Sequence, residues 1–98
     1  MKTLMLITTI LCFGMNSALA AKNPHVVFVT GDEEYRSEES MPMLARILKR
    51  DFGFEISIAY SLDDKGFVDP NNTADVTGIE ALKTADLLVL FTRFRHWP

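Results

Sequence analysis

Two short segments contain the residues whose chemistry points to a functional site. One segment is acidic and the other is basic and aromatic. Together they supply the candidate ligand-binding residues Asp32, Glu33, Glu34, Tyr35, Arg36, Arg93, Arg95, His96 and Trp97. Carboxylates and a histidine can exchange protons, bind a metal or hydrogen-bond a polyol, and aromatic rings can stack on a sugar face. The sequence assigns none of these residues a catalytic role.

A structural role is the alternative for the same residues, and it is the commoner role for any single one of them. An acidic side chain of residues 32–34 can form an ion pair with Arg93 or Arg95 and so hold two loops together. Outside the two segments, His25 is expected to be a solvated or capping residue at the start of a strand. The pair Asp63-Asp64 is expected to form a turn.

Several familiar cofactor chemistries find no support. Gly31 alone follows the first apolar run, which is not the three-glycine dinucleotide motif, and neither a Gly-x-x-x-x-Gly-Lys loop nor a zinc-ligand spacing occurs. Thr92 and Arg93 occupy the position where a phosphorylated receiver domain needs an aspartate. Residues 21–98 contain nine Lys and Arg against thirteen Asp and Glu, a formal charge of −4. We therefore expect no cofactor, no metal and no nucleic-acid partner.

The elements that must position the two segments follow from hydrophobic periodicity. Residues 25–30 are a short apolar run rich in β-branched side chains, typical of a strand covered on both faces of a parallel sheet. Residues 38–52 have helical spacing. Ser37 or a neighbour is expected to cap this helix, Pro42 to be tolerable only within its first turn, and Gly53 to end it. The predicted apolar face consists of Met41, Leu44, Ile47, Leu48 and Phe52.

The second half of the chain repeats the pattern. Residues 55–61 alternate as in a less covered edge strand, residues 62–77 read as a polar loop, residues 78–85 as a short helix and residues 86–92 as an apolar third strand. The order β-α-β-α-β predicts the first part of a parallel, flavodoxin-like three-layer α/β/α fold, with the second strand beside the first and the third on its other side. The ligand site is then expected where the strand order reverses, between the first and third strands.

The first twenty residues have the pattern of a cleavable export signal. Lys2 precedes an apolar stretch of about a dozen residues, which is too short to cross a bilayer as a mature helix. Ala18 and Ala20 give the small-x-small pattern of a cleavage site after Ala20. The alternative is an uncleaved membrane anchor. The expectation is a secreted or periplasmic chain with no membrane partner after cleavage, and with its only cysteine, Cys12, removed.

Residues 21–98 are expected to be the N-terminal part of a longer domain. A domain this short without disulfides is marginal, and the third strand needs a neighbour that the sequence does not supply. Phe94 and Trp97 follow that strand closely, and such large aromatic side chains are rare at a chain terminus directly after a core strand. The alternative is a complete three-strand domain that covers its open edge by dimerisation.

Two stretches carry a resemblance to a known family. They are Gly31 to Glu39, which reads GDEEYRSEE, and Ala85 to Arg95, which reads ADLLVLFTRFR. With the runs around them they resemble the beginning of a ThuA-like (trehalose utilisation) domain of the class I glutamine amidotransferase-like superfamily. The resemblance covers almost all of residues 21–98, and it implies a flavodoxin-like fold of which this chain would hold less than half.

The resemblance gives limited help with mechanism. Superfamily members that hydrolyse glutamine use a cysteine, which residues 21–98 lack, so glutaminase activity is not supported. ThuA-like domains are associated with sugar metabolism, which implies that the parent protein binds or processes a carbohydrate. A non-catalytic interaction or scaffold module is the alternative. For the 98-residue product itself, an inactive truncated remnant is expected.

Overall fold

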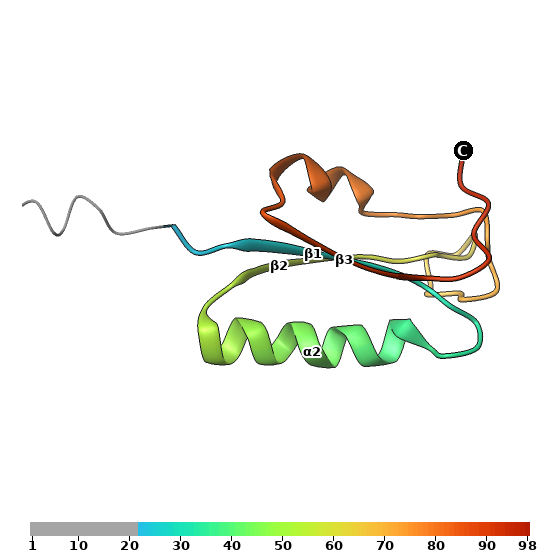
Figure 1. Cartoon of the computed structure of the whole chain (residues 1–98). Helices are drawn as coiled ribbons and strands as arrows, with labels where there is room; N and C mark the ends of the chain where they lie inside the picture. The colour runs from blue at the N-terminus through green and yellow to red at the C-terminus, as the bar shows by residue number, and fades with distance from the viewer. Residues whose placement is uncertain (1–21) are drawn as a thin grey trace, which may run out of the picture.

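The computed structural model describes residues 22–98, which form a three-strand parallel sheet with one helical segment on each face (Figure 1). The elements are β1 (His25–Gly31), α2 (Ser37–Phe52), β2 (Glu55–Ala59), the 3-10 helix η1 (Ile79–Thr84) and β3 (Leu87–Thr92). The strand order is β2-β1-β3. The predicted α/β fold class, element order and strand order are therefore confirmed. The predicted export signal lies outside the described residues.

The register of the sheet separates two cores. Val26 and Phe28 of β1 lie on the face covered by α2, where Ala45 completes the buried cluster. The alternate residues Val27 and Val29 lie on the opposite face, which η1 covers. All four valine and phenylalanine side chains of β1 are at most 1% exposed. Residues 26–29 of this central strand are apolar without interruption because both faces of the strand are covered.

The sequence predicts the end of helix α2 better than its start. Gly53 ends the helix as predicted, in the left-handed conformation at φ 68°, with its N–H directed at the last carbonyls. The expectation that the side chain of Ser37 or a neighbour caps the start is wrong, because the N-cap residue is Arg36 and no side chain forms a capping hydrogen bond. The hydroxyl of Ser37 instead accepts a hydrogen bond from Gly31 N at 3.0 Å. Pro42 lies beyond the first turn, inside the helix, which contradicts its predicted position.

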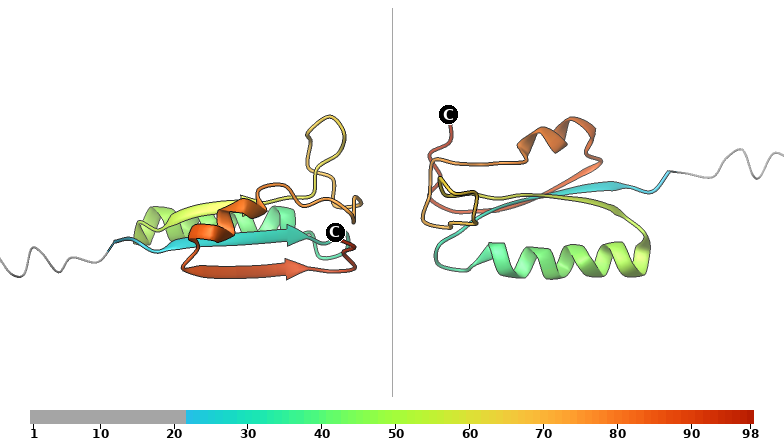
Figure 2. Two further views of the ribbon diagram at one scale, coloured as in Figure 1. Left: turned by 90° about the horizontal axis from the view of Figure 1, so that it is seen from above. Right: turned by 180° about the vertical axis from the view of Figure 1, so that it is seen from behind.

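The predicted apolar face of α2 is only partly covered. Met41 and Leu48 pack against the core, whereas Leu44, Ile47 and Phe52 are exposed. Exposed apolar residues also occur on both faces of β3, at Leu87, Leu88 and Leu90. In the part of the chain that the structure describes, no element lies beyond β3 (Figure 2). The sheet therefore has an open, apolar edge at β3.

Of the two roles predicted for His25, solvated or capping, the structure contradicts the solvated one. His25 is buried at the amino end of β1, where its Nδ1 lies 3.0 Å from the carbonyl oxygen of Thr84 and its Nε2 lies 2.8 Å from the hydroxyl of Ser57. These contacts tie β1 to β2 and to η1. The predicted turn at Asp63 is confirmed, because its Oδ1 accepts hydrogen bonds from the backbone N–H groups of Lys65 and Phe67.

Candidate functional site

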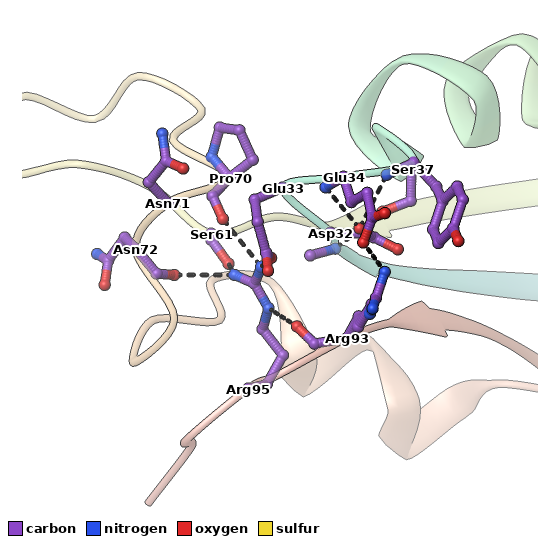
Figure 3. A network of polar contacts seen from close by, with 12 residues as sticks. Asp32, Glu33, Glu34, Ser37, Ser61, Pro70, Asn71, Asn72, Arg93 and Arg95 are labelled. Atoms are coloured by element: carbon purple, nitrogen blue, oxygen red, sulfur yellow. Dashed lines mark hydrogen bonds and ion pairs between the residues drawn. The ribbon is translucent and has the colours of Figure 1, made fainter.

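The two segments singled out from the sequence meet at the carboxyl end of the sheet (Figure 3). The last register pair of β1 and β3 is Gly31 with Thr92, and Arg93 N donates to Gly31 O at 3.0 Å. Parallel neighbours end at the same edge, so the loop after β1 and the tail after β3 lie together. The structure therefore brings both segments to the point between β1 and β3 where the strand order reverses.

Asp32 organises the loop between β1 and α2. Its side chain is buried, and its Oδ1 accepts hydrogen bonds from Glu34 N at 2.8 Å and Tyr35 N at 3.0 Å. Its own backbone N–H donates to the carboxylate of Glu38 at 2.8 Å, and its carbonyl accepts from Arg36 N. These contacts form a tight local turn. The geometry gives Asp32 a structural role.

Arg95 is the centre of a saturated polar network (Figure 3). Its side chain is only 4% exposed, and its Nη2 donates to Glu33 Oε2 at 2.6 Å. Its other contacts are with the carbonyl oxygens of Arg93, Pro70 and Asn72 and the hydroxyl of Ser61. A guanidinium has five N–H donors, and five acceptors surround this one. Arg95 and Glu33 therefore hold the tail against the loop that contains residues 70–72.

Gly31 gives the stem of Arg95 its room. Its φ is 149°, and a Cβ built at this position would lie 3.1 Å from Arg95 Cδ. That distance is shorter than ordinary van der Waals contact, so a side chain here would displace the arginine. Gly31, the last residue of β1, thus allows the close packing of Arg95.

Arg93 has a different environment from Arg95. It pairs with the carboxylate of Glu34, and its guanidinium carbon lies 5.4 Å from the centre of the Tyr35 ring and 4.5 Å from that of Phe94. Both distances are within the range of cation–π contact. Tyr35 and Phe94 are each 62% exposed. We call Glu34, Tyr35, Arg93 and Phe94 the aromatic rim.

The remaining residues of the tail are divided between core and solvent. Trp97 packs against the cluster under η1, and its indole N–H donates to Asp75 O at 3.2 Å. His96 is exposed, and its backbone N–H donates to Thr73 O at 2.8 Å. Of these two predicted site residues, His96 therefore has its side chain at the surface, and the ring of Trp97 contributes to packing.

Arg36 lies on the other side of the same loop, beside a hollow of about 500 Å³. It forms an exposed ion pair with Glu39 at 2.6 Å, and it has a left-handed backbone with φ 56°. Tyr60 also lines the hollow, and burial raises the pKa of its phenol. The complete lining consists of Arg36, Glu38, Glu39, Pro42, Tyr60, Val68 and Pro70.

Two residues of this region, Tyr60 and Phe94, are not among the site residues that the sequence predicts. Tyr60 falls within the predicted second strand, and Phe94 lies inside the basic and aromatic segment. Phe94 has φ 51°, and left-handed backbone at a residue other than glycine is strained and concentrates at functional sites. The alternation of β2 could have indicated Tyr60, since it is the last large side chain before the polar loop.

A second hollow of about 510 Å³ lies at the opposite end of the sheet and is lined partly by His25, Glu55, Thr84 and Asp86. Residues 22–98 contain no group of three or more His, Cys, Asp or Glu side chains placed to hold a metal ion. In the same range, no helix is both long and apolar enough to span a bilayer.

No family model, no curated protein and no solved structure matches this chain.

Proposed function

We propose that residues 21–98 are the N-terminal part of an exported ThuA-like domain, and that the whole protein binds or processes a carbohydrate at the carboxyl end of its sheet. The proposal starts from the resemblance of GDEEYRSEE and ADLLVLFTRFR to such domains. It places the protein outside the cytoplasm, secreted or periplasmic, because of the export pattern in the first twenty residues. It assigns no catalytic residue.

The aromatic rim is the observation that carries the carbohydrate proposal. Tyr35 and Phe94 are both largely exposed, and both rings lie within cation–π distance of Arg93, at the point where ligands bind in open parallel sheets. Exposed apolar side chains that gather beside polar groups can mark a ligand-binding surface. A sugar ring presents C–H groups that pack on such a face and hydroxyl groups that bond to neighbouring charges.

The open edge at β3 supports the idea of a larger domain. Leu87, Leu88 and Leu90 expose apolar surface on both faces of the strand, and the outer backbone of β3 has no partner within residues 22–98. A parallel sheet is normally buried on both faces. Further polypeptide of the same domain, supplying a neighbouring strand, would cover this surface.

Isothermal titration of the secreted protein, expressed with its complete reading frame, tests the carbohydrate proposal against a panel of neutral mono- and oligosaccharides. We expect at least one sugar to bind, and both Tyr35→Ala and Phe94→Ala to weaken it about tenfold, because each removes a stacking surface. Phe67→Ala is the matched control, since Phe67 is similarly exposed but lies in the loop of residues 62–77. If Tyr35→Ala and Phe94→Ala bind the sugar as tightly as the control Phe67→Ala, the aromatic rim is not the sugar-binding surface.

A non-catalytic interaction module is the second candidate, and the Arg95 network favours it. Asp32, Glu33 and Arg95 are held by protein contacts, so much of the charge at the sheet end already has partners. The two candidates differ in turnover. Hydrolysis or transfer by the intact protein that disappears in Glu34→Gln or His96→Ala excludes the interaction module.

A further inference from the structure

We infer that the ion pair of Arg93 and Glu34 recognises two neighbouring hydroxyl groups of an uncharged sugar. The inference rests on the proposed carbohydrate function and goes beyond it, because it names the class of sugar and the residues that select it. Tyr35 and Phe94 then supply the stacking surface, and the ion pair supplies the polar recognition.

The contrast between the two arginines of the tail carries the first step. All five donors of Arg95 have acceptors around them, so it has none to offer a ligand. Arg93 bonds through Nη1 to Glu34, and in the part of the chain that the structure describes its other N–H groups have no acceptor. Its side chain is about one-third exposed. Of the two tail arginines, Arg93 is therefore the one that can donate to a ligand.

Glu34 adds the complementary group. One of its carboxylate oxygens, Oε2, accepts from Arg93, and within residues 22–98 the other has no hydrogen-bond donor. The pair thus presents free donors and a free acceptor side by side. A hydroxyl group both donates and accepts, whereas a carboxylate or phosphate only accepts. Two adjacent hydroxyls of a sugar match this arrangement, one accepting from Arg93 and the other donating to Glu34.

The local charge selects against an anionic sugar. When the first turn of α2 is counted with the two segments, five carboxylates stand against the three guanidinium groups of Arg36, Arg93 and Arg95. The five carboxylates belong to Asp32, Glu33, Glu34, Glu38 and Glu39. A uronate or sugar phosphate that approached Arg93 would meet this excess of negative charge. An uncharged sugar would not.

The rim also holds the pair in place before a ligand arrives. The Arg93 guanidinium lies within cation–π distance of both exposed rings, and its backbone N–H is fixed to Gly31 O at 3.0 Å. A guanidinium that is already positioned loses less conformational entropy on binding. No residue of the aromatic rim lines either of the two hollows described above, and both rings are largely exposed. Such an exposed site suits a sugar presented at the end or along the side of a chain.

Calorimetry with methyl α-glucopyranoside, methyl α-mannopyranoside and methyl α-galactopyranoside, their single deoxy analogues and the matching uronates tests the inference. For the glycoside that binds best, we expect one pair of adjacent hydroxyls whose removal costs about tenfold in affinity, as for hydrogen bonds to charged groups. In the Arg93→Met variant, removing the same two hydroxyl groups from the sugar should cause no further loss of affinity. The uronate should bind more weakly than the neutral sugar. Glu34→Gln removes one negative charge, so it should reduce the difference in affinity between the two sugars.

Controls separate this inference from the carbohydrate proposal and from unfolding. Arg46→Met removes an exposed arginine of α2 and should leave binding unchanged. Arg93→Lys keeps the charge but lacks the planar fork, so it should also lose the dependence on the hydroxyl pair. Sugar binding with no dependence on any hydroxyl pair, or tighter binding of the uronate, overturns the inference and leaves the carbohydrate proposal standing. Failure of the wild-type protein to bind any glycoside or oligosaccharide overturns both.

Discussion

The guanidinium of Arg95 and the carboxylate of Glu33 form an ion pair at 2.6 Å that is largely removed from solvent on the arginine side. Arg93, two residues before Arg95, makes an ion pair with Glu34 that is open to solvent. Both pairs link the loop after β1 to the tail after β3. They differ in what they can do, because one is enclosed by acceptors and the other is bordered by exposed rings.

Arg95→Met is expected to destabilise the fold by about 3 kcal/mol, since it leaves Glu33 and several carbonyl oxygens without their donor. Arg93→Met removes an exposed pair and should cost less than about 1 kcal/mol. Urea unfolding followed by the fluorescence of Trp97, the single tryptophan, measures both values. Equal losses in the two variants would contradict a special structural role for Arg95.

Asp32 should tolerate the loss of its charge but not of its side chain. Asp32→Asn keeps an oxygen that can accept from Glu34 N and Tyr35 N, so the free energy of unfolding should change by less than about 1 kcal/mol. Asp32→Ala loses both bonds and should cost about 2 kcal/mol. Equal losses in Asp32→Asn and Asp32→Ala, which both lack the charge, would show that the charge and not the pair of turn hydrogen bonds is what matters.

Pro42→Ala is expected to stabilise the protein by about 1 to 2 kcal/mol. Proline inside a helix lacks the N–H that would bond to Glu38 O, and this defect costs about 3 kcal/mol relative to alanine. Part of the gain is offset because alanine buries less apolar area than proline at this half-buried position, and because the unfolded chain has more freedom with alanine. Thermal unfolding measures the shift, and Met43→Ala is a control at an exposed neighbour.

Tyr60 should make the fold sensitive to alkali. Burial raises the pKa of its phenol in the folded state, so the stability that its neutral form provides is complete below the unfolded pKa of about 10. That stability is lost as the pH rises through the higher folded pKa. Tyr60→Phe should therefore lose less stability between neutral and strongly alkaline solution than the wild type does. Tyr35→Phe, which removes an exposed phenol, is the matched control in the same urea titrations.

Hydrophobic periodicity predicts most of the fold because each pattern depends on residues that are close together in the sequence. The unbroken apolar run of β1 reflects a strand covered on both faces, and Gly53 ends α2 because it adopts a left-handed backbone without strain. The start of α2 was predicted less well. Ser37 has the right chemistry for a cap, but its hydroxyl serves the backbone of Gly31 instead, and this contact depends on how β1 meets the helix.

The meeting of the two site segments could be predicted, but the roles of their residues could not. Parallel topology alone brings Asp32 and Arg93 to one edge. The saturation of Arg95 depends on the carbonyls of Pro70 and Asn72, which belong to a loop without periodic pattern. No spacing in the sequence indicates that Trp97 folds back to bond with Asp75, so its place in the core appears only in three dimensions.

The exposed leucines of β3 can be covered within one molecule or by a second molecule, and the rates of these two processes depend differently on protein concentration. Covering the strand with polypeptide from the same molecule is unimolecular, so its rate is independent of how much protein is present. Pairing of the strand with another molecule is bimolecular, and an unpaired strand edge is a template for such pairing. Dilution therefore favours monomers, whereas concentration favours intermolecular sheets that grow from the Leu87, Leu88 and Leu90 side of the molecule.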